Sequence, residues 1–268
     1  MRFEKWQGLG NNYLIVRRDE WQIPLTPERA ALLCDIHFGV GGDGILEVDN
    51  DHGHPRMTVW NPDGSIAENC GNGIRMVTRH LQRRGGLPAD GVIMTGGGPV
   101  RVRVLPDERV RVSMGRAVFP DGEAFESLAT SEGDVELAHV TTGNPHAIIL
   151  SDDPDAVVRV VGPAVETNPR FPDRTNVEFV RVDGPSEITM RVWERGVGET
   201  MACGTGACAS AVAAVRLAGG VAPVTVHLAG GDLEIDVDED LEVTMTGPAD
   251  LLYEGVLSPA LSVRLEAQ

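Results

Sequence analysis

The sequence predicts an α+β protein of two similar halves, each with its strands wrapped around one central helix. Landmark residues recur at one offset of 133 residues, and short stretches rich in β-branched residues alternate in polarity. Each half also contains one helix that begins with glycines. The second of these, over 207–218, is apolar on nearly every face, which is typical of a buried helix.

The internal repeat has four landmarks. At an offset of 133 residues the matched positions are Asn11 and Asn144, Asp43 and Asn176, Trp60 and Trp193, and Cys70 and Cys203. A pair of glycines follows each central helix, at 85–86 and at 219–220. Because there are only two copies, we expect pseudo-twofold symmetry and not a solenoid.

The elements of the first half follow from local signals. Residues 1–16 predict a β-hairpin with a glycine-rich turn at 8–12. Thr26 and Pro27 predict a helix start, because threonine caps and proline suits the first helical position. The remaining predicted elements are a loop over 39–44, strands over 45–48 and 57–60, a helix from Cys70 to about Arg84, and strands over 92–94, 100–105 and 109–114.

Composition excludes several classes of protein. The chain has 268 residues, 23 basic against 40 acidic, and a net charge of −17, which repels nucleic acid and anionic membranes. No apolar run approaches a membrane helix, and the N-terminus has no apolar run like that of a signal peptide. We therefore expect a cytoplasmic protein with a small-molecule ligand, no nucleic-acid partner and no membrane association.

The four cysteines point to thiol chemistry more than to cross-links. Cys34, Cys70, Cys203 and Cys208 lack the Cys-x-x-Cys spacing of zinc sites, and disulfide frameworks are rare in cytoplasmic proteins. Cys34 and Cys208 lie in apolar runs and are expected to pack in cores. Cys70 and Cys203 remain as candidate catalytic thiols, with no metal site predicted.

Each candidate thiol stands at the start of a glycine-bearing helix. A helix N-terminus leaves backbone N–H groups without partners within the helix and carries partial positive charge, so it binds carboxylates and favours a thiolate. Asn69 before Cys70 is expected to be the N-cap of the first helix. Its counterpart Ala202 cannot cap, so we expect a ligand to complete part of the second helix start.

Two thiols on opposite faces of one carbon could remove a proton on one side and return it on the other. Inversion of an α-amino acid requires this chemistry, with one thiolate as base and one thiol as acid. We expect the two helix starts to face each other across a cleft that closes around the substrate, because most of the barrier must be lowered by preorganised donors in a water-excluded site.

Six segments together resemble the diaminopimelate epimerase family. They are residues 8–12, 61–65, 69–75, 143–146, 194–200 and 202–208, and they include Cys-Gly-Asn-Gly at Cys70 and Cys-Gly-Thr-Gly at Cys203. The resemblance implies interconversion of LL- and meso-2,6-diaminopimelate, in lysine and peptidoglycan precursor biosynthesis, without pyridoxal phosphate, metal or any other cofactor. It also implies two domains with barrel-like, mostly antiparallel sheets: residues 1–115 with a return strand from about 249–268, and residues 116–248. We further expect a homodimer.

The same resemblance implies roles for individual residues. Cys70 and Cys203 would be the base and acid pair. Backbone groups would hold the reacting carboxylate at Gly71, Asn72, Gly204 and Thr205. The distant amino-acid end would be recognised by Asn61, Asn176, Glu194 and Arg195, and the pocket would be lined by Asn11 and Asn144. His146 and Glu194 are candidates for assisting the two thiols.

Two positions depart from the pattern of many family members, which have Asp where Asn12 stands and Gln where Gly44 stands. Gly44 removes a side chain near the reacting end, so a changed substrate is an open alternative. A related two-thiol racemase acting on another amino acid, such as histidine, is a second hypothesis. A PhzF-like isomerase or a non-catalytic amino-acid-binding module is a third, although such a relative would lack one or both thiols.

Overall fold

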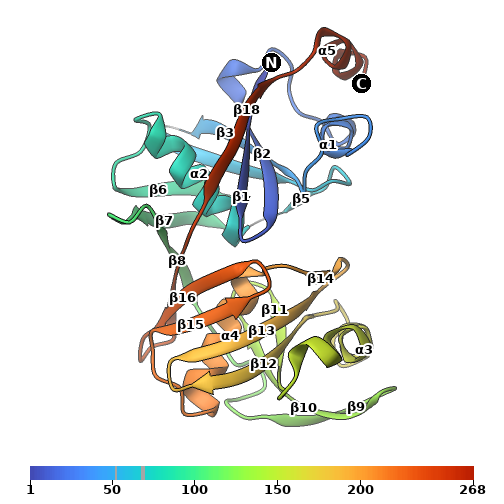
Figure 1. Cartoon of the computed structure of the whole chain (residues 1–268), viewed down its shortest axis with the longest axis vertical. Helices are drawn as coiled ribbons and strands as arrows, with labels where there is room; N and C mark the ends of the chain where they lie inside the picture. Colours follow the sequence, from blue (N-terminus) through green and yellow to red (C-terminus); the bar gives the residue numbers. More distant parts are fainter. Residues whose placement is uncertain (52, 68–69) are drawn as a thin grey trace. The chain divides into compact units, whose positions relative to one another are not determined.

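The computed structural model describes residues 1–51, 53–67 and 70–268. The chain divides into two compact units (Figure 1). Unit 1 is Met1–Val112 with Pro248–Gln268, and unit 2 is Ser113–Gly247. Both chain termini lie in unit 1, where the backbone N–H of Leu257 donates to the carbonyl of Met1 at 3.0 Å. The architecture is α+β.

Unit 1 is a mostly antiparallel sheet with a helix packed against it. Its strands are β1 (Arg2–Gly8), β2 (Asn11–Arg17), β3 (Ile45–Asp51), β4 (His54–Trp60), β5 (Ile66–Ala67), β6 (Asp90–Thr95), β7 (Gly98–Val104), β8 (Val110–Arg116) and β18 (Asp250–Val256). Its helices are η1 (Arg18–Glu20), α1 (Pro27–Cys34), α2 (Gly71–Arg83) and α5 (Pro259–Glu266). The strand order is β18-β1-β2-β3-β4-β6-β7-β8, with β5 also paired to β4. β8 begins in unit 1 and ends in unit 2.

Unit 2 repeats this order of pairing. Its strands are β9 (Glu126–Thr130), β10 (Gly133–Thr141), β11 (Pro145–Leu150), β12 (Asn176–Gly184), β13 (Glu187–Glu194), β14 (Gly198–Thr200), β15 (Val224–Leu228), β16 (Gly231–Val237) and β17 (Glu242–Gly247), with helices α3 (Pro154–Glu166) and α4 (Gly204–Leu217). The order is β9-β10-β11-β12-β13-β15-β16-β17, with β14 also paired to β13. When neighbouring strands are counted as pairs from the start of each order, the third and fifth pairs are parallel in both units.

Strand register shows where the repeat keeps its offset and where it slips. Val59 pairs with Ala67 in unit 1 and Val192 with Thr200 in unit 2, so the offset of 133 holds there. However, Trp60 pairs with Ile45, whereas Trp193 pairs with Val177. The counterpart of Asn176 is therefore Gly44 and not Asp43 as predicted. A sequence offset cannot reveal this because the one-residue difference is absorbed in the preceding loop.

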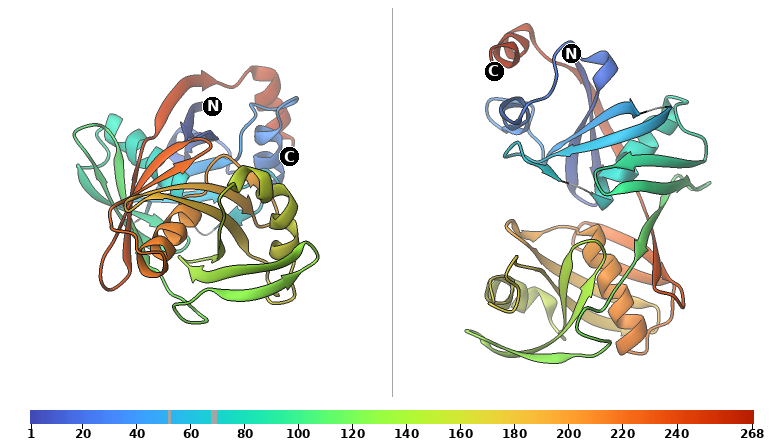
Figure 2. Two further views of the ribbon diagram at one scale, coloured as in Figure 1. Left: turned by 60° about the horizontal axis from the view of Figure 1, so that its bottom comes forward. Right: turned by 180° about the vertical axis from the view of Figure 1, so that it is seen from behind.

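The central helix of each unit is buried against its sheet (Figure 2). Residues 206–214 of α4 are all buried, which confirms the prediction for the apolar helix, whereas Thr205 in its first turn and residues 215–217 in its last turn are at least partly exposed. The helix predicted after Thr26 is also confirmed as α1, since the Thr26 hydroxyl accepts the N–H of Arg29 at 3.3 Å. The predicted hairpin corresponds to β1 and β2.

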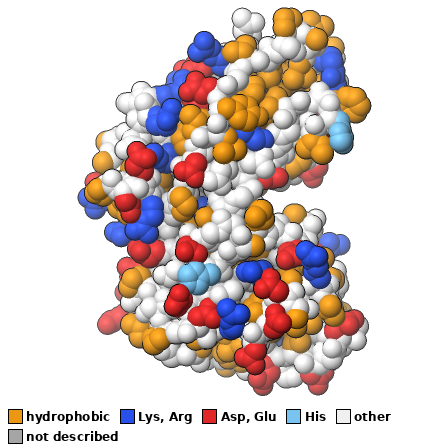
Figure 3. Space-filling view, in the orientation of Figure 1, with side chains coloured by type: hydrophobic (Ala, Val, Ile, Leu, Met, Phe, Trp, Pro, Cys, Tyr) orange, Lys and Arg blue, Asp and Glu red, His pale blue; other side chains and the backbone are white. Residues whose placement is uncertain are grey.

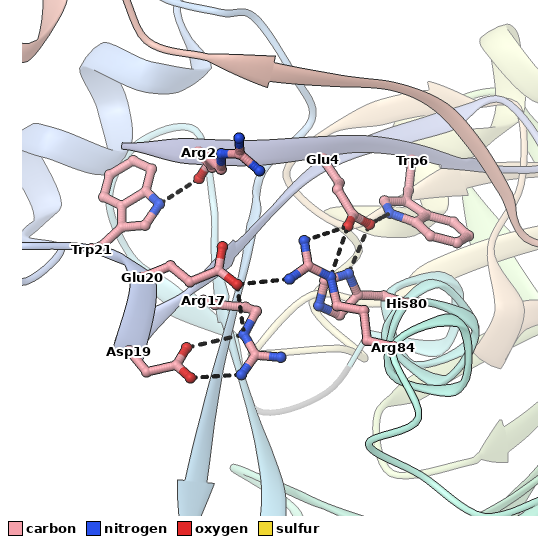
Figure 4. Close-up of polar contacts among 9 residues, drawn as sticks. All are labelled: Arg2, Glu4, Trp6, Arg17, Asp19, Glu20, Trp21, His80 and Arg84. Atoms are coloured by element: carbon pink, nitrogen blue, oxygen red, sulfur yellow. Dashed lines mark hydrogen bonds and ion pairs between the residues drawn. The ribbon is translucent and has the colours of Figure 1, made fainter.

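A buried carboxylate attaches β1 to α2 in unit 1 (Figure 4). Glu4 accepts hydrogen bonds from the Trp6 indole at 2.7 Å and from the Arg84 guanidinium at 2.9 and 3.1 Å, and its Oε2 lies 2.7 Å from Nδ1 of His80. Burial raises the pKa of Glu4, but the contacts with His80, Trp6 and Arg84 outweigh this and lower it to about 2. The carboxylate therefore stays charged and holds α2, whose first residue Gly71 follows Cys70.

Exposed hydrophobic side chains are prominent on unit 1, over the part that carries α1 and α5 (Figure 3). They include Ile36, Phe38, Val256 and Val263, each more than half exposed. Beneath them, a core cluster joins Phe3, Trp21 and Leu33 with Leu257 and Leu265. Within the described residues, no helix combines the length and the apolar character needed to cross a bilayer.

Candidate active site

Cys70 is the N-cap residue of α2, and its sulfur accepts the backbone N–H of Gly73 at 3.2 Å. We predicted Asn69 as the cap. That residue lies outside the described residues, but the capping position belongs to Cys70, so the prediction is wrong in its assignment. A Cβ atom at Gly73 would lie 2.7 Å from a methyl carbon of Leu46. Glycine is needed there because the helix start packs tightly against β3.

Cys203 caps α4 in the same way. Its sulfur accepts the N–H of Gly206 at 3.3 Å and lies 3.5 Å from the Thr205 hydroxyl. Ala202 therefore precedes the cap and does not occupy it. The helix start has a cap in Cys203, so the prediction that a ligand replaces a missing cap is wrong. Sulfur can accept a backbone N–H, although cysteine is not among the favoured capping residues.

The surroundings of Cys70 within unit 1 are mostly neutral and polar. The Cys70 thiol donates to the hydroxyl of Tyr13, with 3.6 Å between Sγ and Oη. The side-chain oxygen of Asn72 accepts from the buried guanidinium of Arg75 at 2.9 Å, which fixes this side chain against α2. Asn61 follows β4 and uses its amide to bond the Ser65 hydroxyl at 2.9 Å.

Asn11 and Asn12 are the first two residues of β2. The backbone and side-chain N–H groups of Asn12 both donate to one oxygen of Asp43, at 2.7 and 3.0 Å, and the N–H of Asp43 donates to the Asn12 carbonyl at 2.8 Å. An amide at position 12 can donate to Asp43, whereas a second carboxylate could not. Asn12 therefore attaches the loop over 39–44 to β2.

In unit 2 a buried row of polar groups lies beside α4. Nδ1 of His146 lies 2.7 Å from Oε1 of Glu178, and Nε2 lies 2.9 Å from the side-chain oxygen of Asn144. Neither His146 nor Glu178 has any exposed side-chain surface. A Cβ atom at Gly206 would lie only 2.4 Å from Oε1 of Glu178, so the glycine lets this carboxyl reach the start of α4.

In unit 2 the residues predicted to recognise the distant end of a substrate each make hydrogen bonds. The Asn176 amide donates to the Pro145 carbonyl at 2.9 Å, and its oxygen accepts the backbone N–H of Arg195 at 3.0 Å. Glu194 accepts a short hydrogen bond from the Thr200 hydroxyl. The Arg195 guanidinium donates to the Asp173 carbonyl at 3.3 Å, and Arg195 is exposed.

The electrostatics of Cys203 favour the thiol. Burial raises its pKa well above the ordinary value, and the nearby carboxyls of Glu194 and Glu178 raise it further. Contacts with Thr205 and the Gly206 N–H act in the opposite direction and are outweighed. Burial also raises the pKa of Glu194 and of Glu178. A negative charge on Cys203 is therefore costly at this buried position beside two carboxyl groups, and the thiol form is favoured.

Our reading of the sequence missed two residues beside the candidate thiols. Glu178 is a charged residue inside the apolar stretch of β12, two positions after Asn176, and this misplaced charge was the available signal. Tyr13 stands 133 residues before His146, so the repeat itself matched the two positions. Among the described residues, no cluster of His, Cys, Asp and Glu has a metal-binding arrangement.

The chain is similar to known diaminopimelate epimerases over nearly its whole length. A family model described as diaminopimelate epimerase matches residues 3–120 and 138–252. The chain is 44% identical to the diaminopimelate epimerase of Pelotomaculum thermopropionicum, over 95% of this chain and 98% of that protein. It is 40% identical to the diaminopimelate epimerase of Desulfitobacterium hafniense, over 96% of this chain and 98% of that protein.

Solved structures show the same fold at low sequence identity. A PhzF-family phenazine biosynthesis protein from Bacillus anthracis aligns with a TM-score of 0.73 at 17% identity, over 96% of this chain and 99% of that chain. A hydroxyproline epimerase from Agrobacterium vitis, with bound trans-4-hydroxy-L-proline, aligns with a TM-score of 0.73 at 15% identity, over 97% of this chain and 94% of that chain.

Proposed function

Because the chain belongs to the diaminopimelate epimerase family, we propose that it interconverts LL- and meso-2,6-diaminopimelate by proton transfer at the α-carbon. The observation that carries the proposal is the matched pair of helix starts. Each begins with a cysteine N-cap whose sulfur accepts the N–H three residues later, at 3.2 Å for Cys70 and 3.3 Å for Cys203. The reaction belongs to lysine and peptidoglycan precursor biosynthesis.

The helix starts suit the reacting carboxylate. The first N–H groups of a helix have no partner within it, and they carry the positive end of the helix dipole. We assign this contact to the backbone of Gly71 and Asn72 in unit 1 and of Gly204 and Thr205 in unit 2. These contacts also stabilise the extra negative charge that develops when the α-proton leaves.

Each of the two sulfurs takes part in one proton transfer. In this proposal one thiolate removes the α-proton and the other thiol donates a proton to the opposite face, so the centre inverts. The raised pKa of Cys203 supports its assignment as the thiol of the free enzyme, with Cys70 as the thiolate. Reaction in the reverse direction starts from the opposite protonation states. His146 and Glu194 remain the candidates for assisting these transfers, and no cofactor enters the proposal.

Recognition of the distant amino-acid end is assigned to polar residues in both units. Arg195 suits a carboxylate, because a guanidinium can donate two parallel hydrogen bonds, and Glu194 suits an ammonium group. Asn61 and Asn176 complete this set, and Asn11 and Asn144 line the pocket. A substrate without a second amino-acid group would leave these side chains without their ligand, which disfavours histidine and other simple amino acids.

Incubation of LL-diaminopimelate in heavy water tests the proposal. Deuterium should enter at the α-carbon as the meso isomer forms, and Cys70→Ala or Cys203→Ala should abolish epimerisation. Cys208→Ala is a matched control, because it removes a buried thiol from the same helix, α4. Racemisation of another amino acid with no turnover of diaminopimelate would show that the assigned substrate is wrong.

We further propose that the enzyme works as a homodimer in the cytoplasm. All four cysteines are free thiols, and catalytic thiols require a reducing compartment. The exposed hydrophobic side chains of unit 1, among them Phe38 and Val256, support an interface between two copies. Light scattering coupled to size exclusion would give the mass of the particle, and a mass of one chain at micromolar concentration would contradict the dimer.

A further inference from the structure

Tyr13 lies on β2 beside the candidate thiol of unit 1. The residue is 9% exposed, and its hydroxyl is 3.6 Å from the sulfur of Cys70. The same sulfur also accepts the N–H of Gly73. The hydroxyl and the backbone N–H are thus both placed to donate to this sulfur when it is a thiolate, and donors of this kind favour the charged form.

Gly44 makes room for the tyrosine ring. A Cβ atom at Gly44 would lie 2.6 Å from Cε1 and 3.1 Å from Cδ1 of Tyr13, and 2.6 Å from the carbonyl oxygen of Trp60. Real Cβ contacts are not this short, so any larger residue at position 44 would displace the ring or the backbone of β4. The Tyr13 ring can therefore occupy its position only because position 44 has no side chain.

Strand register shows what replaces this feature in unit 2. In unit 1 Leu14 is paired with Ile45, and the residues just before them in the two parallel strands are Tyr13 and Gly44. In unit 2 His146 is paired with Asn176. Tyr13 therefore corresponds to His146, and Gly44 corresponds to Asn176. In unit 2 the Asn176 amide fills its place by bonding Pro145 and Arg195, and His146 bonds Glu178. In unit 1 the ring of Tyr13 occupies this space and its hydroxyl reaches the thiol.

We propose that Tyr13 is a positioning residue for Cys70: its hydroxyl orients the sulfur and stabilises its thiolate form, and Gly44 is required because it admits the tyrosine ring. In the thiol, Sγ–H donates to Oη, whereas in the thiolate Oη–H donates to sulfur. The contribution to turnover rests on the proposed function. The contribution to thiol reactivity does not, because it can be measured without substrate.

The test is the pH dependence of Cys70 alkylation in Tyr13→Phe. Iodoacetamide would be applied between pH 6 and 10, and modification of the Cys70 peptide would be followed by mass spectrometry. Loss of a hydrogen bond to a charged sulfur should reduce the thiolate population about tenfold, so the midpoint should rise by about one pH unit. Tyr253→Phe is the matched control, since Tyr253 is the only other tyrosine in the sequence.

Turnover provides a second readout. With LL-diaminopimelate, Tyr13→Phe should lower kcat about tenfold, shift the pH profile of kcat upward and leave KM nearly unchanged. If neither variant nor wild type turns over this substrate, the proposed function fails, but the alkylation result still decides the role of Tyr13. An unchanged midpoint for Cys70 in a folded Tyr13→Phe protein would overturn the proposal.

Gly44→Ala tests whether the two positions act together. It should raise the midpoint of Cys70 alkylation in the wild-type background, because it displaces the Tyr13 ring. In the Tyr13→Phe background the same substitution should add little, since the hydroxyl has already been removed. Equal and additive shifts in the two backgrounds would contradict the coupling. If Gly44→Ala does not fold, Tyr13→Phe alone decides the proposal.

Discussion

Glu178 and His146 share a hydrogen bond of 2.7 Å between Oε1 and Nδ1, and neither side chain is exposed. The other ring nitrogen of His146 contacts the side-chain oxygen of Asn144, so Nε2 carries a proton and donates it. One further proton then lies between Nδ1 and Oε1, and the pair is neutral as a whole whichever atom holds it. The burial of two titratable groups is tolerated for this reason.

Glu178→Ala should destabilise the protein, because it leaves Nδ1 of His146 buried without its partner. We expect a loss of about 1–3 kcal/mol in the free energy of unfolding, measured by urea denaturation. Glu178→Gln should cost less, since its amide can bond the ring. Glu187→Ala is a matched control, because Glu187 contacts His227 at 2.7 Å on the surface. Equal losses at the buried and exposed pairs would contradict this account.

Glu194→Gln should make Cys203 more reactive. Burial is the largest cause of the raised pKa of Cys203, and the Glu194 carboxyl is the next. Removal of its charge should lower the midpoint of the pH-dependent alkylation of Cys203, although burial should keep it above that of a free thiol. Glu199→Gln serves as control, since Glu199 is paired with Arg159. An unchanged midpoint in Glu194→Gln would show that burial alone sets the pKa.

Gly206→Ala should be destabilising despite the better helix propensity of alanine. The new Cβ would lie 2.4 Å from Oε1 of Glu178, so the buried carboxyl would have to move away from His146. We expect a loss of about 1–3 kcal/mol by thermal or urea unfolding, together with reduced turnover. Gly86→Ala is the control, because its new Cβ would meet only ordinary contacts of 3.6 Å with Leu81. A neutral Gly206→Ala would mean that Glu178 can relocate freely.

Acid should weaken the attachment of α2 through Glu4. The pKa of Glu4 is lowered from 4.5 to about 2 in the folded protein, because its contacts with His80, Trp6 and Arg84 outweigh burial. Since the folded value is the lower one, the stabilisation is present above about pH 4.5 and is lost as the pH falls towards 2. Its size is about 3 kcal/mol. Glu4→Gln should lack this part of the pH dependence in denaturation curves at pH 7, 5, 4 and 3, and an unchanged slope would contradict it.

The elements that the sequence predicted well are those specified by neighbouring residues. Thr26 and Pro27 fix the start of α1, Leu9 and Gly10 form the turn between Gly8 of β1 and Asn11 of β2, and the paired glycines at 85–86 follow α2. The repeat was visible because Trp60 and Trp193 keep the same spacing from Cys70 and Cys203. Such signals act within a few residues, so a single sequence contains them.

Other features could not be read from local patterns. The capping position was misplaced by one residue, from Cys70 to Asn69 and from Cys203 to Ala202, because sulfur is not a usual cap and the helix boundary depends on backbone geometry. The equivalence of Asn176 and Gly44 depended on strand register. A shift of one residue changes which side chains are neighbours, and only the pairing of β12 and β3 with adjacent strands fixes it.

The sequence by itself determined the α+β class, the two repeated helix starts with Cys70 and Cys203, and the motifs shared with the diaminopimelate epimerase family. Only the tertiary structure decided that Glu178 lies against Gly206 and His146, that Tyr13 contacts Cys70 through the space left by Gly44, and that the pKa of Cys203 is raised. The physical reason is that a thiol's reactivity depends on burial and on charges within a few ångströms. Those neighbours come from strands that are distant in sequence.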